Sequence, residues 1–278
     1  MQIRAPGKIN LYLQVCGRRG DGYHLIDSLM APLAVHDVVE VAPAEKLTLE
    51  IIGGDTLAQE PAERNLVYRA ALLLQGMLPT KPGARMVLHK HLPVAAGLGG
   101  GSSDAAAVLK GLLPLWHKEL SRKKWLKLTE ELGADVPFFI DAVPQYVGGI
   151  GEALSPVQLP EVPVLLVNPR IAVPTAEVFR RGIKNCSGPA SKRERFSDVW
   201  ELADYLAPLS NDLTENAVDM APVIAEIIAA IGETEGCLLS RMSGSGATCF
   251  GLYETMEAAQ KAVNRFPDYW AVATHIPA

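Results

Sequence analysis

A run of glycines is the feature of this sequence that most restricts its fold. Residues 93–109 read PVAAGLGGGSSDAAAVL, with four glycines within five positions, directly before an alanine-rich stretch. Glycine loses more backbone entropy on folding than any other residue, so such a run is destabilising unless the geometry requires it. A loop that wraps phosphates has this requirement, because its backbone N–H groups point inward and no Cβ can intervene. The helix that follows adds free N–H groups and a positive dipole end. The segment therefore predicts an anion-binding loop of triphosphate size.

Two common phosphate-binding patterns do not fit this loop. A Walker loop requires Gly-Lys-Ser/Thr, whereas this chain has Gly-Ser-Ser, and a dinucleotide fingerprint requires glycine where Ser102 stands. A flexible linker is the alternative, but linkers do not end in a helix cap with an apolar helix behind it. The hydroxyls of Ser102 and Ser103 suit a phosphate and a magnesium ion.

Composition places the chain among soluble globular proteins. It has 278 residues, 49% of them hydrophobic, and a net charge of −5, which gives no indication of a nucleic-acid or membrane surface. The cysteines lie far apart without a C-x-x-C pair, which argues against a zinc knuckle or a disulfide scaffold and favours a reducing cytosol. The N-terminus fits no secretory signal, and no apolar run is long enough to span a membrane. We expect a cytoplasmic protein with small-molecule partners; a homodimer is compatible with the sequence.

Hydrophobic periodicity predicts a two-domain protein of mixed α and β structure. The first part reads as strands at 9–15, 38–41, 47–52 and 84–89, with a helix capped by Asn65 and another at 105–113 that Pro114 ends. Residues 144–163 are rich in proline and glycine and predict a loop region and a domain boundary. The domains expected are 1–154 and 155–278. The second alternates strands and helices in the manner of a small α+β sandwich: strands at 164–167, 237–241, 248–253 and 270–275, and helices at 175–181, 222–231 and 256–266.

Three motifs, in order along the chain, resemble those of the GHMP kinases. Ala5–Asn10 (APGKIN) is similar to their first motif, residues 93–106 to their second, and Ser243–Ala247 (SGSGA) to their third glycine loop. The resemblance implies the α/β GHMP kinase fold, with an N-terminal ATP domain like the second domain of ribosomal protein S5 and a ferredoxin-like α+β C-terminal domain. It also implies ATP and Mg²⁺ as cofactors.

The stretch APGKINLYLQVCGRRGDGYHLIDSL, with GADVPFF further on, resembles the cytidine-nucleotide-using branch of these kinases. That branch acts in the non-mevalonate isoprenoid route. The resemblance implies transfer of the ATP γ-phosphoryl group to the tertiary 2-hydroxyl of a cytidine-diphosphate methylerythritol. Another GHMP kinase, of the homoserine or mevalonate type, and a non-catalytic nucleotide-binding sensor are the alternatives.

The same resemblance assigns roles to individual residues. Asp135 is the expected base or orienting group for the attacking hydroxyl, and Lys8 is expected to keep it ionised and to offset charge on the transferred group. The ATP-binding residues implied are Asn65 and the loop Pro93, Val94, Ala95, Ala96, Gly97, Leu98, Gly99, Gly100, Gly101, Ser102 and Ser103. The substrate-binding residues implied are Asn10, Tyr23, His24, Phe179, Gly244 and Ser245. Among them, the resemblance assigns Tyr23, His24 and Phe179 to the cytosine pocket.

Each assignment has a purely structural alternative. An aspartate after a helix end is a common turn former, a single lysine is usually a surface residue, and Asn65 is explained equally well as a helix cap. Tyr23 and Phe179 could be packing residues, and SGSG a tight turn. His89 and His91 lack a third ligand, so we assign no metal site to them. Asp104 suits a helix N-terminus but would repel a neighbouring triphosphate unless magnesium intervenes.

Overall fold

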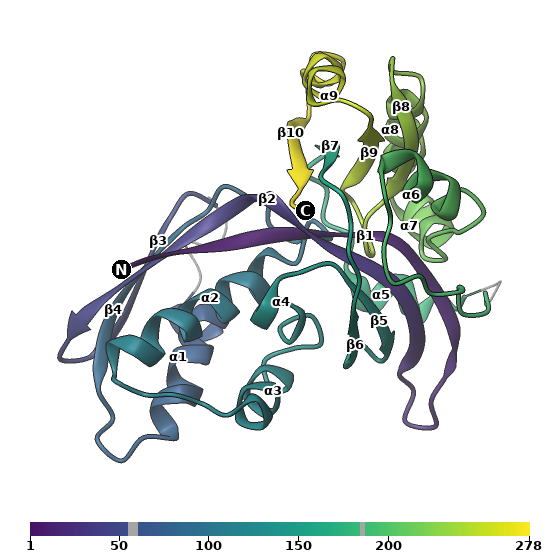
Figure 1. Cartoon of the computed structure of the whole chain (residues 1–278). Helices are drawn as coiled ribbons and strands as arrows, with labels where there is room; N and C mark the ends of the chain where they lie inside the picture. Colours follow the sequence, from purple (N-terminus) through teal and green to yellow (C-terminus); the bar gives the residue numbers. More distant parts are fainter. Residues whose placement is uncertain (55–60, 184–186) are drawn as a thin grey trace. The chain divides into compact units, whose positions relative to one another are not determined.

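The backbone of the protein divides into two compact units (Figure 1). The computed structural model describes residues 1–54, 61–183 and 187–278. Each unit is built from several stretches of the chain. The first comprises Met1–Gly7, His36–Val94 and Gly99–Ala142, and the second comprises Lys8–Val35, Ala95–Leu98 and Val143–Ala278.

Two long strands contribute to both units. β1 (Gln2–Arg18) and β2 (His24–Ala44) pair with each other, and their apolar residues are buried along much of their length. In the first unit, the end of β2 pairs antiparallel with β4 (Gly83–His89), which runs parallel to β3 (Leu47–Ile52). In the second unit, the start of β2 pairs with β5 (Gln145–Gly149), which forms a hairpin with β6 (Ala153–Pro156).

The first unit places helices on its strands. α2 (Gly100–Leu115) is the longest of them and carries a nearly continuous run of buried residues from Ser103 to Leu113. A Cβ added at Gly111 would lie 2.6 Å from the Cδ1 atom of Ile3 and 2.9 Å from a methyl group of Val41, so a larger residue there would force these side chains to move. The other helices of the unit are η2 (Ala62–Arg64), α1 (Leu66–Gly76), α3 (Arg122–Glu130) and α4 (Phe138–Asp141).

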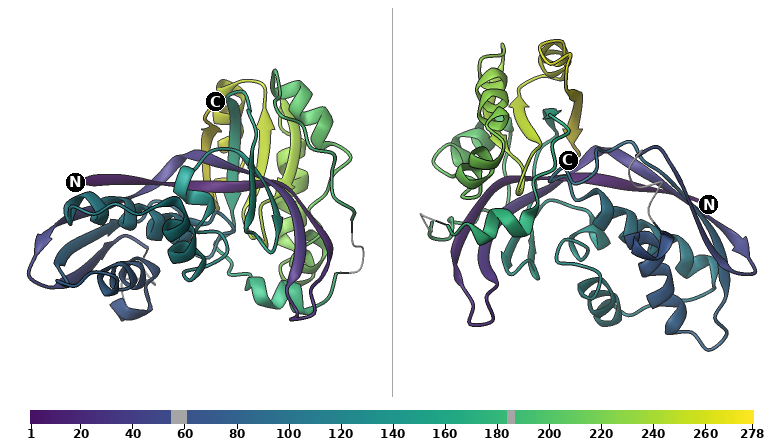
Figure 2. Two further views of the ribbon diagram at one scale, coloured as in Figure 1. Left: turned by 60° about the horizontal axis from the view of Figure 1, so that its bottom comes forward. Right: turned by 180° about the vertical axis from the view of Figure 1, so that it is seen from behind.

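The second unit contains an antiparallel sheet of four strands in the order β10-β7-β9-β8, which lie side by side in the left view of Figure 2. The bounds are Val162–Asn168 for β7, Cys237–Met242 for β8, Cys249–Tyr253 for β9 and Trp270–Ile276 for β10. This strand order, with one or more helices in each of the two crossovers, is that of a ferredoxin-like domain. The predicted α+β C-terminal fold is therefore confirmed.

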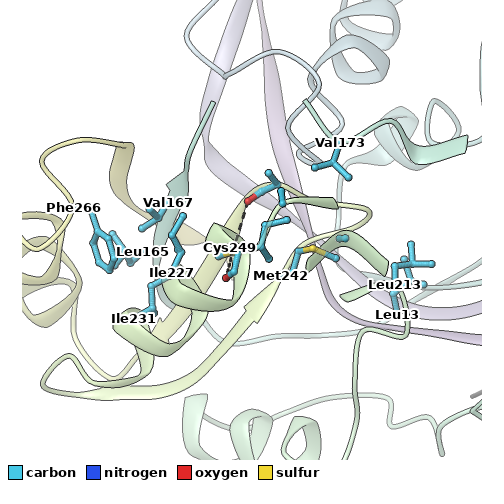
Figure 3. Close-up of a cluster of buried hydrophobic side chains, with 14 of the residues drawn as sticks. Leu13, Leu165, Val167, Val173, Leu213, Ile227, Ile231, Met242, Cys249 and Phe266 are labelled. Atoms are coloured by element: carbon cyan, nitrogen blue, oxygen red, sulfur yellow. Dashed lines mark hydrogen bonds between the residues drawn. The ribbon is translucent and has the colours of Figure 1, made fainter. Parts of the chain in front are cut away.

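Helices cover this sheet and close its core. α8 (Val223–Gly232) places Ile227 and Ile231 among the sheet residues Leu165 and Val167, and the cluster continues to Leu13 of β1 (Figure 3). The remaining helices of the unit are α5 (Thr175–Arg180), α6 (Val199–Leu206), α7 (Thr214–Met220) and α9 (Met256–Val263).

Most of the predicted elements are confirmed, but three predictions were wrong. α2 begins at Gly100 rather than at residue 105, because Gly99 caps it with a left-handed φ of 66°. The helix also continues through Pro114 to Leu115, although proline supplies no backbone N–H and its ring crowds the carbonyl four residues earlier. The region 144–163 holds the β5–β6 hairpin and the start of β7 rather than a loop, and α6 and α7 were not predicted.

The boundary at residue 154 stays a prediction. No helix in the described part of the chain is long and apolar enough to cross a membrane.

Candidate active site

Residues of the three glycine motifs meet within the second unit. The backbone N–H of Lys8 donates to the carbonyl of Leu98 at 2.9 Å, which joins the first motif to the second. The Ser243 hydroxyl accepts from the backbone N–H of Asn10 at 3.2 Å and donates to the carbonyl of Gly97 at 3.1 Å. One fully buried hydroxyl thus links all three motifs.

Positive φ values, and at Gly97 a close approach as well, explain two of the glycines in these loops. Gly97 has a φ of +74°, and an added Cβ would lie 2.5 Å from the carbonyl oxygen of Ser243. Gly244 has a φ of +57°, and its Cβ would lie 3.5 Å from Nζ of Lys8 and 3.4 Å from Oδ1 of Asn10. The third loop is therefore more than a tight turn, because its backbone lies directly against the side chains of the first motif.

Lys8 is a buried residue and not a surface lysine. Its exposed fraction is 4%, and its Nζ donates to Oδ1 of Asn10 at 2.5 Å. Asn10 in turn donates from Nδ2 to the hydroxyl of Ser28 at 2.9 Å, which fixes the amide orientation. A desolvated ammonium held in one rotamer is a stronger electrostatic group than the same ammonium in water. This arrangement suits a lysine that stabilises developing negative charge.

The backbone of the predicted phosphate loop alternates in handedness. Ala95, Gly97 and Gly99 have positive φ values of 52°, 74° and 66°. Alternation of this kind turns successive N–H groups toward one side, which is the geometry of an anion-binding nest. The Ser103 hydroxyl follows in the first turns of α2. It is buried and has no hydrogen-bond partner among the described residues, as expected for a group that contacts a ligand.

Asp104 belongs to a buried ionic cluster in the first unit. The ammonium of Lys90 contacts Asp37 and, at 2.9 Å, Oδ2 of Asp104, and all three side chains are almost fully buried. Oδ1 of Asp37 accepts from the backbone N–H groups of His91 and Leu92, at 2.6 and 2.8 Å. Asp104 therefore points into this cluster, where the ammonium of Lys90 offsets its charge. Burial raises the pKa of Asp104 to about 7, because the charged carboxylate is removed from water. The charge of Lys90 opposes this rise, and the neighbouring carboxylate of Asp37 adds to it.

His24 and Phe179, two of the predicted cytosine-binding residues, lie against each other in the second unit. Their rings stack with a centroid distance of 4.9 Å and an interplanar angle of 29°. Burial lowers the pKa of His24, and Arg18 lowers it further. Tyr23 is 61% exposed, with the Arg19 guanidinium 5.9 Å from its ring centroid. The structure thus brings two of the three aromatic residues together and leaves Tyr23 open to solvent.

Comparisons with known proteins agree with this geometry. The model for the GHMP kinases N terminal domain matches residues 65–149, and the model for GHMP kinases C terminal matches residues 189–272. The 4-diphosphocytidyl-2-C-methyl-D-erythritol kinase of Paramagnetospirillum magneticum is 44% identical over 275 residues, covering 96% of this chain and 95% of that protein. A crystal structure of 4-(cytidine 5'-diphospho)-2C-methyl-D-erythritol kinase matches at a TM-score of 0.85 and 34% identity, covering 100% of both chains.

The chain belongs to the 4-diphosphocytidyl-2-C-methyl-D-erythritol kinase family. The predicted GHMP kinase fold is thereby confirmed. The homoserine kinase of Cytophaga hutchinsonii matches in structure at a TM-score of 0.62 but only 18% identity, with 100% of this chain and 94% of that chain covered, so it shares the fold alone.

Three other predicted site residues of this kinase lie in different parts of the fold. The Asn65 side chain caps α1 by accepting from the N–H of Val67 at 2.9 Å, so its role as a helix cap is confirmed. The Ser245 hydroxyl contacts the Thr175 hydroxyl at 2.7 Å, which joins the third loop to the start of α5. Asp135 is half-buried in the turn between α3 and α4 of the first unit, whereas Lys8 belongs to the second, so their partnership stays a prediction.

Two structural roles in this kinase were missed by sequence reasoning. The link that Ser243 makes among the motifs had one available signal, its position directly before Gly244. Lys90 had none, because a lysine between two histidines reads as an exposed strand end. Among the described residues, no three His, Cys, Asp or Glu side chains are grouped so that they could hold a metal ion.

Proposed function

We propose that this chain transfers the γ-phosphoryl group of ATP to the 2-hydroxyl of 4-diphosphocytidyl-2-C-methyl-D-erythritol. The products are the 2-phosphate and ADP, and the step belongs to non-mevalonate isoprenoid biosynthesis. The family membership supports this reaction, because the relative from Paramagnetospirillum magneticum and the matching crystal structure both carry the name of that kinase. The hydroxyl of Ser243, which links all three glycine motifs, is the structural observation that carries it.

The phosphate end of the site is proposed to consist of the loop Pro93–Ser103 and Lys8. The backbone N–H groups of this loop would hold the triphosphate, with positive φ at residues 95, 97 and 99 turning them to one side. Lys8 would offset negative charge on the transferred group. Phosphoryl transfer needs little covalent participation from a protein, so this positioning and charge carry most of the rate gain.

Asp135 is the proposed base for the substrate. Its carboxylate would accept or orient the proton of the 2-hydroxyl, which makes that oxygen the nucleophile. Magnesium, when bound with ATP, neutralises the phosphate charges, and the unpartnered hydroxyl of Ser103 would contribute an oxygen to hold it.

The nucleobase end is proposed to consist of His24 and Phe179, with Tyr23 as an additional stacking residue. An aromatic pair gives a base a stacking surface, and the ring nitrogens of histidine can hydrogen-bond the edge of cytosine. Asn10, Gly244 and Ser245 are the proposed contacts to the remainder of the substrate, and Asn65 to adenine. The cytoplasm as location, a homodimer and the domain boundary at 154 belong to the same proposal.

An assay of ADP release tests the reaction. The wild-type protein should turn over 4-diphosphocytidyl-2-C-methyl-D-erythritol with Mg²⁺ and ATP, and neither homoserine nor mevalonate. Asp135→Asn should lose activity by about 100-fold or more, because the amide cannot accept the proton. The variant should keep its fold, because asparagine has the same shape as aspartate. Asp141→Asn is the matched control, since Asp141 forms an exposed ion pair with Arg122.

Other outcomes would replace this proposal. Turnover of homoserine or mevalonate alone would assign a different GHMP kinase substrate. Tight ATP binding without turnover of any of the three alcohols would indicate a nucleotide-binding sensor.

A further inference from the structure

Two asparagines, five positions apart, make the same unusual contact in the second unit. Asn211 precedes α7 and Asn216 lies within it, and each is 5% exposed. Each donates both hydrogen bonds of its side-chain amide to two backbone carbonyls from a distant part of the chain. Neither residue belongs to a glycine motif, and neither is used by the proposed reaction.

Asn211 holds the third glycine loop. Its Nδ2 donates to the carbonyls of Met242 at 2.9 Å and Gly244 at 2.8 Å, the residues on either side of Ser243. Its Oδ1 accepts from the N–H of Leu213 at 3.0 Å, which fixes which way the amide faces. Gly244 lies against Lys8, so the conformation of this loop sets what surrounds the Lys8 ammonium.

Asn216 holds the helix that carries Phe179. Its Nδ2 donates to the carbonyls of Val178 at 3.0 Å and Gly182 at 2.8 Å, at the C-terminal end of α5. α5 has only six residues, and a helix that short is not stable without tertiary contacts. Phe179 follows Val178 directly and stacks on His24, so the amide of Asn216 also fixes the position of that ring.

We infer that Asn211 and Asn216 are positioning residues that divide the site between them. Asn211 orders the loop that faces the transferred phosphate, and Asn216 orders the helix that supports the base-stacking ring. This inference rests on the proposed function, because it identifies the two ends of the site with phosphoryl transfer and cytosine binding. It predicts that the same substitution at the two positions affects different kinetic constants.

The variants Asn211→Asp and Asn216→Asp form a matched pair. Each keeps the side-chain shape, removes two N–H donors and sets a carboxylate against two carbonyl oxygens, so the losses of stability should be similar. Steady-state kinetics should separate them. Asn211→Asp should lower kcat about 30-fold with little change in the KM for the cytidine substrate, because reacting groups are misplaced. Asn216→Asp should raise that KM about tenfold with kcat within about threefold of wild type, because base stacking is weakened.

Hydrogen exchange of backbone amides gives a readout that does not need turnover. Asn211→Asp should speed exchange in 242–246 and leave 178–182 unchanged, and Asn216→Asp should do the reverse. If the wild type does not phosphorylate the substrate but this pattern holds, the proposed function fails and the positioning of the two segments stands. If the wild type is active and both variants change the same kinetic constant equally, or exchange does not localise, the inference is overturned. Should either aspartate variant fail to fold, Asn→Ser at the same position removes the two bonds without adding a charge and is judged by the same criteria.

Discussion

The hydroxyl of Ser243 lies between Asn10 and Gly97, 3.2 Å from the backbone nitrogen of the one and 3.1 Å from the carbonyl oxygen of the other. These two residues are 87 positions apart in sequence, yet this single side-chain oxygen satisfies a polar group of each. The Ser243 hydroxyl and the Asn10 N–H are buried and the Gly97 carbonyl is partly buried, so loss of the hydroxyl leaves two polar groups without this partner.

Ser243→Ala should therefore destabilise the protein by about 1–3 kcal/mol, the usual cost of leaving buried polar groups unsatisfied. Urea unfolding measures this loss. Ser240→Ala is the control, because Ser240 lies three residues earlier, in β8, and is only half-buried. Equal unfolding free energies for the two variants would show that the Ser243 hydroxyl does not join the motifs.

Gly97→Ala should be far more damaging than an ordinary glycine substitution. The new Cβ would stand 2.5 Å from the carbonyl oxygen of Ser243 at a φ of +74°, so the third loop would have to move. We expect a loss of about 2–4 kcal/mol in unfolding free energy and a fall in kcat/KM of about 100-fold or more. Thermal unfolding and the ADP-release assay measure the two effects.

Gly101→Ala is the comparison within the same loop. A Cβ there meets no atom within 4 Å, and the residue lies in α2, where alanine is the better helix former. Its stability should be unchanged or raised by up to about 1 kcal/mol. If the loop holds ATP, the KM for ATP should still rise, because the added methyl group keeps phosphates from the backbone. An unchanged KM would argue against phosphate contact at this position.

Asp104→Asn should alter how stability depends on pH. The pKa of Asp104 is raised from 3.8 to about 7, so the folded protein holds this proton more tightly than the unfolded chain. A raised carboxyl pKa favours the folded state below pH 3.8, and that advantage is lost as the pH climbs to about 7. The variant lacks this titration and keeps the Lys90–Asp37 pair. As the pH rises across that window, the unfolding free energy of the variant minus that of wild type should increase, by an amount on the order of a few kcal/mol.

Urea unfolding at several pH values checks this sign. Asp141→Asn should behave in the opposite way, since Arg122 lowers the pKa of Asp141 and the stability it provides is lost as the pH falls. A difference between Asp104→Asn and wild type that does not vary with pH would show that Asp104 does not titrate in this range.

Phe179→Ala should change the site at its nucleobase end. Without the ring at 4.9 Å, His24 becomes more exposed, so its lowered pKa should move up toward 6.5. An NMR titration of the histidine measures this shift. The KM for the cytidine substrate should rise about tenfold, as expected for the loss of one stacking partner. A KM and a His24 pKa that both stay at their wild-type values would exclude the stacked pair as part of the base site.

The elements that depend mainly on neighbouring residues could be predicted from the sequence. The Asn65 cap, the strands around residues 50 and 86 and the glycine loop are all determined by neighbours along the chain. The β5–β6 hairpin was missed because its prolines and glycines resemble a loop, and only pairing with β2 makes it a strand. α2 passes Pro114 because Leu112 and Leu113 are buried, a tertiary effect that overrides the local preference.

The parts of the site that consist of short sequence motifs could be predicted, whereas the parts that depend on contacts between distant residues could not. The glycine motifs could be found from their spacing. The setting of Asp104, in contrast, depends on Lys90, which directly follows β4, and on Asp37, which lies within β2. Tyr23, His24 and Phe179 were all expected at the base, and no local signal indicates that His24 rather than Tyr23 stacks on Phe179.

The interleaving of chain segments means that this protein cannot be dissected by cutting it once. A break after residue 154 would leave Lys8–Val35 and Ala95–Leu98 on the N-terminal fragment, although both belong to the unit formed mainly by the C-terminal fragment. Ser243 would then be separated from both Asn10 and Gly97. Neither fragment alone would contain a complete set of glycine motifs, so activity should return only when the two pieces are made together and reassociate.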